Sequence, residues 1–308
     1  MSQPYRIAVI IPCFNEAPTI GSVVTTFQHA LPTATIYVYD NNSHDDTAAL
    51  AHAAGATVRR ETMQGKGHVV RRAFADIEAD IYLLVDGDGQ HAAPDAIPLI
   101  QHLLTHQLDM VIGARDVTDK SAYRPKHASG NRLFNHVVAR LFRHGISDIF
   151  SGYRVFSRRF VKSFPAASTG FEIETELSIH ALDAHIPFDE LAITHHPRPE
   201  GSYSKLNTWR DGLRISWMIV NLYRQIKPLQ LFGAVALLLF TTALLLGWPL
   251  VTVFLETRMV PRIPTAIIVM GILVFSFLSL TCGIILEGIA QARRENRRLH
   301  YLQQPALR

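Results

Sequence analysis

Two aspartates, Asp86 and Asp88, follow directly after the apolar run Ile81–Val85, in the stretch VDGDGQH at 85–91. Such a run is typical of a buried strand, so both carboxylates should lie at its carboxyl end, where their like charges repel. A divalent cation relieves that repulsion, and Mg²⁺ or Mn²⁺ held by oxygen ligands commonly bridges to substrate phosphates. Gln90 adds a neutral oxygen on the same side of an extended segment. These residues alone leave open a metal site, a phospho-accepting pair and a solvated turn.

The phospho-accepting alternative corresponds to the haloacid-dehalogenase type of phosphatase, which places Thr or Val at the fifth position of its D-x-D motif. Here Gln90 occupies that position, and the acidic pair follows about the fourth strand rather than the first. A D-x-D phosphohydrolase therefore ranks second to a metal site.

Polar residues also follow two earlier apolar runs, and a basic glycine-rich segment begins a helix. Asp40, at the end of the second run, can accept hydrogen bonds from a ribose or a base, while Ser43 and Asp45 can cap the next helix. Lys66 lies in a Gly-Lys-Gly sequence at a predicted helix start, a position suited to phosphate. Neither G-x-G-x-x-G nor a Walker A sequence is present, so a dinucleotide fingerprint and an ATPase loop are excluded.

The elements that must position these residues alternate between short apolar runs and amphipathic segments. This alternation predicts a parallel α/β sheet, in which ligands bind at the carboxyl ends of the strands. The predicted strands are 6–12, 35–40, 58–61, 81–85, 110–113 and 153–156, and the predicted helices are 18–30, 45–54, 66–78 and 94–106. The polar segments 12–16, 40–46 and 86–90 all fall at strand ends.

Composition limits the class of protein. Apolar residues make up 48% and charged residues 18% of the 308, which favours a membrane-associated protein over a disordered one. The net charge is only +4 and no dense basic block is present, so we expect no nucleic-acid partner. The first residues read as a strand rather than a signal peptide. Neither Cys13 nor Cys282 has a spacing that suits zinc, and a disulfide between them is not expected.

Two long uncharged runs, Leu229–Leu255 and Ile263–Leu286, follow the α/β pattern. Each exceeds the roughly 20 residues that a helix needs to cross a bilayer, so we predict two transmembrane helices. Lys and Arg are concentrated before the first run and after the second, with only Arg258 and Arg262 between them. The positive-inside rule then places both termini and the α/β domain in the cytoplasm.

The segment 208–228 interleaves Trp and Tyr with Arg and Lys, which is typical of a helix lying at the headgroup level. The predicted organisation is a cytoplasmic catalytic domain at 1–207, this interfacial amphipathic helix at 208–228, the spans 229–255 and 263–286, and a basic cytoplasmic tail at 287–308.

An ordered set of motifs carries a family resemblance: IPCFNEAPTI (11–20), DNNSHDDT (40–47), GKG (65–67), VDGDGQH (85–91), DIFSGYRVF (148–156), GFEIETEL (170–177) and RPEGSYSKL (198–206). Over about residues 6–215 the chain resembles GT-A glycosyltransferases of family 2, and within them the dolichol-phosphate mannosyltransferase-like polyprenyl-phosphate hexosyltransferases. The resemblance implies a nucleotide-diphospho-sugar transferase domain with a mostly parallel sheet, joined here to two transmembrane helices.

The resemblance also implies a role for each motif residue. A Mg²⁺ or Mn²⁺ ion on the donor diphosphate would be held by Asp86, Asp88 and Gln90. The nucleotide sugar would further contact Pro12, Asn15, Glu16, Asp40, Lys66, Arg198, Ser204 and Lys205. The acceptor phosphate would meet Arg115 and Arg132, since guanidinium groups bind phosphate oxygens bidentately, and the acceptor pocket would include Ser151 and Arg154.

The implied reaction is inverting, metal-dependent transfer of one hexosyl unit from a UDP- or GDP-linked sugar to an undecaprenyl- or dolichyl-type phosphate. The product, a polyprenyl-phosphate sugar, would serve cell-envelope glycan modification at the bacterial inner membrane or its equivalent. Another lipid or glycan acceptor is an alternative, and a homo-oligomer is left open. Because the acceptor oxygen is already charged, we assign no general base; Glu172, Glu174 and Glu176 are available, but their spacing prevents all three from sharing one helix face.

Two features refine this hypothesis. The family commonly has two adjacent acids in its second motif, whereas this chain has Asp40-Asn41, which leaves the choice between UDP and GDP open. A processive polysaccharide synthase would need further spans and a Q-x-x-R-W element, which the sequence lacks. The uncharged spans also argue against a transporter.

Overall fold

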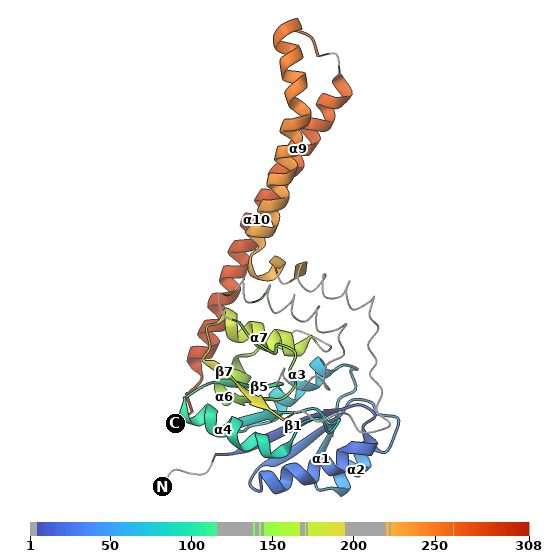
Figure 1. The fold of residues 1–308 in the computed structure, drawn as a ribbon, viewed down its shortest axis with the longest axis vertical. Helices are drawn as coiled ribbons and strands as arrows, with labels where there is room; N and C mark the ends of the chain where they lie inside the picture. The colour runs from blue at the N-terminus through green and yellow to red at the C-terminus, as the bar shows by residue number, and fades with distance from the viewer. Residues whose placement is uncertain are drawn as a thin grey trace. The chain divides into compact units, whose positions relative to one another are not determined.

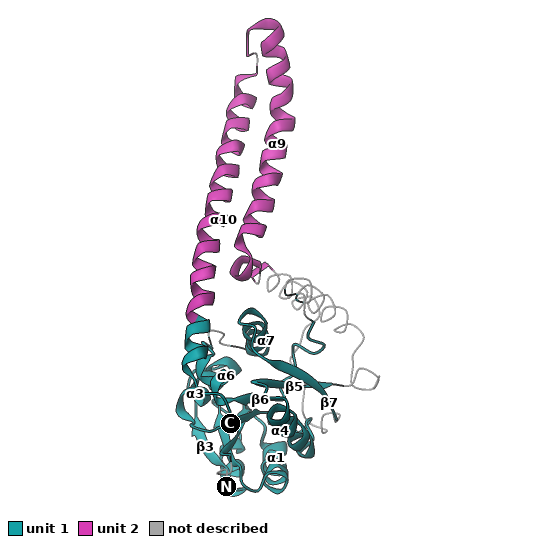
Figure 2. Ribbon diagram, turned by 90° about the vertical axis from the view of Figure 1, so that its left-hand side faces the viewer, with its two compact units in different colours: residues 1–211, 297–308 teal, residues 212–296 magenta. Residues whose placement is uncertain are grey.

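A computed structural model describes residues 5–115, 138, 142, 145–166, 170, 172–194, 220–221, 223–260 and 262–307. The chain divides into two compact units (Figure 2). Unit 1 contains residues 1–211 and 297–308, and unit 2 contains residues 212–296.

Unit 1 is built on a seven-stranded sheet with the order β3-β2-β1-β4-β6-β5-β7. The strands are β1 (Ile7–Cys13), β2 (Thr35–Asp40), β3 (Thr57–Arg60), β4 (Ile81–Leu84), β5 (Met110–Arg115), β6 (Arg154–Ser157) and β7 (Phe188–Ile193). Only β6 runs antiparallel to its neighbours, so the predicted mostly parallel sheet is confirmed.

The strand order brings the polar segments to one edge. Cys13 is the register partner of Asp40, and Ile10 pairs with Leu84, so β1, β2 and β4 all end at this edge. The chain proceeds from β1 outward through β2 to β3, and then returns to form β4 on the other side of β1. This reversal creates a topological switch point between β1 and β4, the position where open α/β sheets bind ligands.

Helices cover both faces of the sheet (Figure 1). One face carries α1 (Ala17–Ala30), α2 (Thr47–Ala53), the short 3₁₀ turn η1 (Ala93–Asp95) and α4 (Ala96–Thr105). The other carries α3 (Lys66–Asp76), α6 (Arg158–Ser163) and α7 (Ile173–Asp183).

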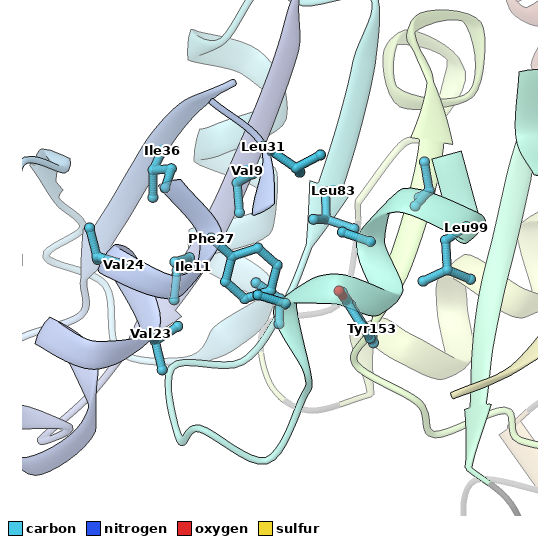
Figure 3. Packing of buried hydrophobic residues seen from close by; sticks show 14 of the residues in the cluster. Val9, Ile11, Val23, Val24, Phe27, Leu31, Ile36, Leu83, Leu99 and Tyr153 are labelled. Carbon is cyan, nitrogen blue, oxygen red and sulfur yellow. The ribbon is translucent and has the colours of Figure 1, made fainter. Parts of the chain in front are cut away.

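The core follows from the alternation of side chains along the strands. On the face of α1 and α4, Val9 and Leu83 pack with Phe27 and Leu99, and the ring of Tyr153 lies edge-on to Phe27 at 6.2 Å (Figure 3). On the opposite face, Phe74 of α3 meets Tyr82, Phe156 and Phe164 through edge contacts. Apolar side chains therefore pack against both faces of β4 and β6, which fixes the positions of the strand ends.

One predicted helix starts later than the sequence pattern indicates. We expected a helix from Asp45, but α2 begins at Thr47 because Asp45 caps it from outside. The Asp45 carboxylate accepts hydrogen bonds from the backbone N–H of Thr47 at 3.1 Å and of Ala17 at 3.1 Å. Asp45 therefore joins the starts of α1 and α2.

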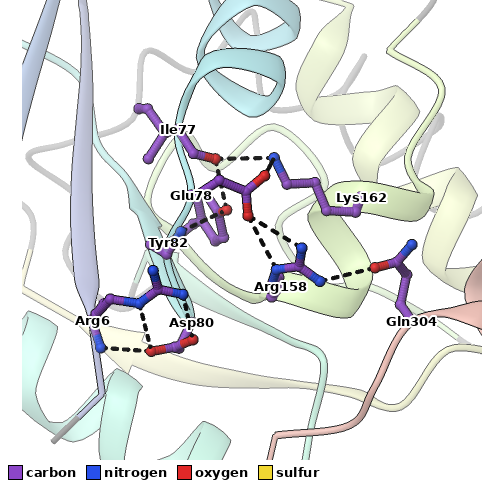
Figure 4. Close-up of polar contacts among 9 residues, drawn as sticks. Arg6, Ile77, Glu78, Asp80, Tyr82, Arg158, Lys162 and Gln304 are labelled. Carbon is purple, nitrogen blue, oxygen red and sulfur yellow. Dashed lines mark hydrogen bonds and ion pairs between the residues drawn. The ribbon is translucent and has the colours of Figure 1, made fainter.

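The last residues of the chain belong to unit 1. The Tyr301 hydroxyl donates to Asp109 Oδ2 at 2.6 Å, and Arg159 both pairs with Asp109 and lies over the Tyr301 ring. Nearby, Arg158 donates to Gln304 and pairs with Glu78, which also receives Lys162 (Figure 4). The predicted tail at 287–308 thus continues as helix to Gln303, and its final part packs on the α/β domain.

Unit 2 contains α9 (Pro228–Thr257) and most of α10 (Ile263–Gln303). Both are long and apolar enough to cross a membrane, with mean hydropathies of 2.2 and 2.5 over their best windows. The helices contact each other through small and hydroxyl residues: Ser276 donates to the Ala236 carbonyl, Ser279 donates to the Phe232 carbonyl, and Gly283 faces Phe232. Such contacts are typical of helix pairs in lipid. Most of segment 208–228 lies outside the described residues.

Candidate active site

The ends of β1 and β2 are cross-linked by hydrogen bonds. The backbone N–H of Asn41 donates to the Cys13 carbonyl at 2.9 Å. The N–H of Asn15 donates to Ser43 Oγ at 3.0 Å, and the N–H of His44 donates back to Asn15 Oδ1 at 2.8 Å. Asn15 adopts a left-handed conformation, with φ of 56°, that asparagine tolerates. The side chain of Asn15, a predicted nucleotide contact, thus holds the two loops together.

A second set of contacts joins the start of α1 to the acidic loop after β4. Thr19 Oγ1 donates to the Gly87 carbonyl at 2.7 Å. Gly89 has φ of +74°, a conformation that favours glycine, and a Cβ on Gly87 would lie 2.7 Å from Cys13 Sγ. Both glycines are therefore needed for the loop to turn tightly while it packs against β1.

Asp86 and Asp88 differ in their surroundings. The Asp86 side chain is 34% exposed, whereas Asp88 is buried at 8% exposure. Asp88 Oδ1 accepts the backbone N–H of Gln90 at 3.1 Å, which fixes the start of the turn. One carboxylate of the pair is thus partly exposed, and the other is buried in the same loop.

Lys66 bridges Asp86 to Glu174, which the sequence offered only as one of three available bases. Its ammonium pairs with Asp86 Oδ1 and, at 2.5 Å, with Glu174 Oε1 of α7. Burial alone would lower the pKa of Lys66, but the charges of Asp86 and Glu174 outweigh burial and raise it. Burial also raises the pKa of Glu174, and Lys66 offsets that rise only in part. Lys66 is therefore a charged group inside the site, with two carboxylate partners.

Gly152 brings the backbone close to Asp86. A Cβ at Gly152 would lie 2.5 Å from Asp86 Oδ2, so a larger residue here would force the carboxylate or the backbone to shift. Ser151 and Arg154, near Gly152 in the chain, make hydrogen bonds that support this segment. Ser151 Oγ donates to the Gly113 carbonyl at 2.5 Å, and the fully buried Arg154 donates to the Ser151 and Ile149 carbonyls. The described contacts occupy both side chains inside the protein, and a place beside the acceptor stays a prediction for Ser151 and Arg154.

Arg115, at the end of β5, is held by Asp148. Its Nε and Nη2 atoms each donate to the carboxylate at 2.7 Å in a two-pronged ion pair. Burial would raise the pKa of Asp148, but the hydrogen bonds and charge of Arg115 lower it below its usual range. Glu190 in turn accepts the N–H groups of Ser147 and Asp148. Arg115 is therefore a partly exposed cation with a fixed orientation.

Asn41, the departure from the family pattern, ties the loop before α3 to β2. Its Nδ2 donates to the Glu61 and Met63 carbonyls, and its Oδ1 accepts the N–H of Gly65 at 2.7 Å. A carboxylate at this position could not donate to two carbonyls. The amide therefore suits the local backbone, while neighbouring Asp40 accepts the N–H of Ser43 at 3.2 Å.

The remaining residues named from the sequence differ in whether the structure describes them. Pro12 and Glu16 lie at the same edge and are partly exposed, and Glu16 precedes α1. Arg132, Arg198, Ser204 and Lys205 lie outside the described residues. Glu172 and Glu176 are partly exposed whereas Glu174 is buried, as their spacing on one helix requires.

The carboxylates of this edge suit a hard cation that keeps other ligands. Within the described residues, no three His, Cys, Asp or Glu side chains gather as a metal-binding group. The edge thus supplies an Asp pair and the neutral Gln90, and Asp86 already binds a cationic group. Mg²⁺ typically takes one or two protein carboxylates and completes its shell with substrate phosphates and water. The residues fit such an ion, and they do not fit a closed zinc site.

Comparison with known proteins decides the family. The sequence profile of the family described as "Glycosyl transferase family 2" matches residues 8–164, which hold the loops after β1, β2 and β4 and the segment before β6. The chain belongs to glycosyl transferase family 2. It is therefore a glycosyltransferase, and the phosphohydrolase alternative is wrong.

Two similar proteins come from Haloferax volcanii and Pyrococcus furiosus. Glycosyltransferase AglJ of Haloferax volcanii is 33% identical over 301 residues, covering 96% of this chain and 97% of its own length. A dolichol-phosphate mannosyltransferase of Pyrococcus furiosus is 26% identical over 234 residues, covering 72% of this chain and 64% of its own. The resemblance to dolichol-phosphate mannosyltransferases is thus confirmed.

A solved structure confirms the GT-A-like fold. Glucosyl-3-phosphoglycerate synthase of Mycobacterium tuberculosis, in complex with Mn²⁺, UDP and glucosyl-3-phosphoglycerate, superposes with a TM-score of 0.55. It shares 23% sequence identity, and the match covers 71% of this chain and 79% of that one. At this identity the likeness establishes the architecture.

Proposed function

We propose that this glycosyltransferase moves a single hexosyl unit from a UDP- or GDP-linked sugar to a polyprenyl phosphate. The observation that carries the proposal is the joining of an acidic, cation-binding strand edge to two helices long enough to span a membrane. Two relatives agree with the proposal: one is a dolichol-phosphate mannosyltransferase, and another is a polyprenol monophosphomannose synthase.

In this proposal Asp86 and Asp88 hold Mg²⁺ or Mn²⁺, with Gln90 as a neutral ligand. The partial exposure of the Asp86 side chain and the fit of the Asp pair to a hard cation support this assignment. When bound, the ion would neutralise charge on the leaving diphosphate. The fold neighbour solved with Mn²⁺ and UDP agrees with this choice.

The side chains of the chain itself would position the two phosphates. Asp40, with the loop of Pro12, Asn15 and Glu16, would contact the nucleoside. Arg198, Ser204 and Lys205 would cover the donor diphosphate. Arg115, oriented by Asp148, would bind the acceptor phosphate together with Arg132. Because the acceptor oxygen is already charged, alignment rather than a general base would drive the transfer, and a single displacement would invert the anomeric centre.

The membrane arrangement is also part of the proposal. The catalytic domain would end near residue 207, segment 208–228 would lie at the headgroup level, and 229–255 and 263–286 would span the bilayer. The Arg and Lys residues flanking the spans would keep the catalytic domain and both termini in the cytoplasm, next to a lipid phosphate at the inner leaflet.

A transfer assay tests this proposal. Purified full-length protein is incubated with Mn²⁺, a short-chain polyprenyl phosphate and each of a panel of radiolabelled UDP- and GDP-sugars. We expect one donor to give chloroform-extractable label that carries a single sugar. If no donor labels the polyprenyl phosphate while a glycan or another lipid acceptor is labelled, the acceptor assignment is wrong. Label of increasing length would indicate a processive synthase.

A further inference from the structure

Lys66 begins a helix at a position predicted to suit phosphate, yet its ammonium group is buried between two carboxylates. Lys66 is only 8% exposed, and its ammonium group forms ion pairs with both Asp86 and Glu174. Asp86 is a proposed ligand of the divalent ion, so Lys66 and the ion would neutralise the same carboxylate. Glu174 itself is 5% exposed, and its Oε2 atom has no hydrogen-bond partner in the described structure.

We propose that Lys66 is a resident counterion of the metal site, and that Glu174 is the positioning residue that retains Lys66 when a divalent ion takes Asp86. The Lys66–Glu174 pair would then set the affinity of the site for its metal. This inference rests on the proposed metal site at Asp86 and Asp88, and it adds to that site a competition between a built-in cation and an added one.

The charges explain why both members are needed. Asp86 and Glu174 carry two negative charges on either side of one ammonium. A divalent ion at Asp86 repels Lys66, which must give up this partner and rely on the other. A buried ammonium without a carboxylate partner is strongly unfavourable. Glu174 would keep Lys66 paired while the divalent ion binds Asp86. Without Glu174, Lys66 could leave Asp86 only by remaining unpaired.

The surrounding backbone restricts how Asp86 can respond. Gly152 approaches so closely that a Cβ there would lie 2.5 Å from Asp86 Oδ2 and 3.1 Å from Lys66 Nζ. Asp86 therefore has little room to turn away from Lys66 on that side. Competition for the carboxylate is then resolved by movement of the ammonium or by loss of the ion.

The test measures binding of Mn²⁺ alone to full-length protein in detergent, with free Mn²⁺ counted by electron paramagnetic resonance. Lys66→Met removes the competitor and should tighten Mn²⁺ binding. Glu174→Gln removes the retaining partner and should weaken it. We expect shifts of about twofold to 150-fold in opposite directions, the range of coupling between directly paired residues. Lys162→Met is the matched control: Lys162 pairs with Glu78 rather than with Asp86 or Glu174, and its loss should leave the affinity unchanged (Figure 4).

A double variant guards against misfolding of the single ones. Lys66→Met with Glu174→Gln removes both charges of the buried pair, and Glu174→Gln should weaken Mn²⁺ binding much less in this background than alone. If both single variants shift the affinity in the same direction, or if the double variant binds as weakly as Glu174→Gln, the counterion exchange is wrong.

The wild-type protein separates this inference from the proposed function. If wild type binds no Mn²⁺, or if Asp88→Asn binds it as well as wild type does, the metal site itself is misassigned. If wild type binds Mn²⁺ through Asp88 but Lys66→Met brings no tightening, only the role of Lys66 and Glu174 is wrong.

Discussion

Asp86 and Asp88 could be placed from the sequence because a strand end is a local property. An apolar run, a sharp change to acidic residues and two glycines lie within a few positions of each other. Glu174 and Asp148 could not be placed in the same way. Each meets its partner, Lys66 or Arg115, only after the sheet brings distant segments together. Pairing across the fold leaves no periodic signal in one sequence.

Asn41 gives a related lesson at the residue scale. Compared with the family motif, it is a missing acid in a nucleotide-binding loop. In the structure its amide donates to two carbonyls and accepts from Gly65, so the local backbone requires an amide. Arg154 is buried, and its guanidinium group donates hydrogen bonds to two carbonyls of its own segment. The motif alone does not predict these contacts.

Replacement of Gly152 tests the close contact at Asp86. In Gly152→Ala the new methyl group would lie within 2.5 Å of Asp86 Oδ2, so the carboxylate or the backbone must shift. Misplacement of a reacting group by about 1 Å can cost a hundredfold in rate, and we expect the sugar-transfer rate to fall by at least about tenfold. Steady-state kinetics with saturating Mn²⁺ measures this loss.

Gly21→Ala is the matched control for that variant. Gly21 lies within α1, and a Cβ there would meet no atom within 4 Å. Because alanine is the better helix former, we expect unchanged transfer and a gain in stability of up to about 1 kcal/mol. Equal activity of Gly152→Ala and wild type would show that the Asp86 loop tolerates the methyl group.

At the scale of elements, the sequence predicted β1 to β6 and the helices between β1 and β5. Their apolar runs are short, continuous and separated by turn residues, so the pattern alone is sufficient. The structure adds β7, whose residues are mostly only partly buried, because an edge strand need not be apolar. It also shows that β6 is antiparallel, a direction that periodicity does not encode.

The packing of α7 on α6 predicts a pH-dependent stability. His180 on α7 is buried against the rings of Phe160 and Phe164, and burial together with the charge of Arg297 lowers its pKa to about 3. Because the unfolded chain binds this proton near pH 6.5, the contribution is complete above that pH and is lost as the pH falls toward 3. Integration gives a loss of about 2 kcal/mol at pH 5.

Thermal unfolding of detergent-solubilised protein between pH 7.5 and pH 5 measures this effect. We expect His180→Leu to flatten the fall in melting temperature seen with wild type. His29→Gln, at an exposed position on α1, should leave it unchanged. A fall of equal size in wild type and His180→Leu would mean that another group controls the acid sensitivity.

At the scale of the whole molecule, the sequence predicted the two long helices more readily than the contacts of the C-terminal residues. Length and apolarity sufficed to predict both long helices, and α9 and α10 contain the predicted segments. The end of the chain was harder to interpret, because its arginines are typical of a solvated basic tail. Instead, Arg297 pairs with Asp183 and Tyr301 donates to Asp109, so the last residues are structural parts of the catalytic unit. These partners lie far away in sequence.

We propose that the enzyme transfers one sugar to a polyprenyl phosphate and that the acidic loop after β4 holds the metal ion for this reaction. The most direct measurement is mass spectrometry of lipids from membranes that contain either wild-type protein or Asp88→Asn, supplied with Mn²⁺, polyprenyl phosphate and the nucleotide sugar. We expect a polyprenyl phosphate bearing a single hexose with wild type and at most about a hundredth as much with Asp88→Asn, since Asp88 would stabilise the leaving diphosphate through the metal. Equal amounts of this lipid from both proteins, or its absence from both, would contradict the account.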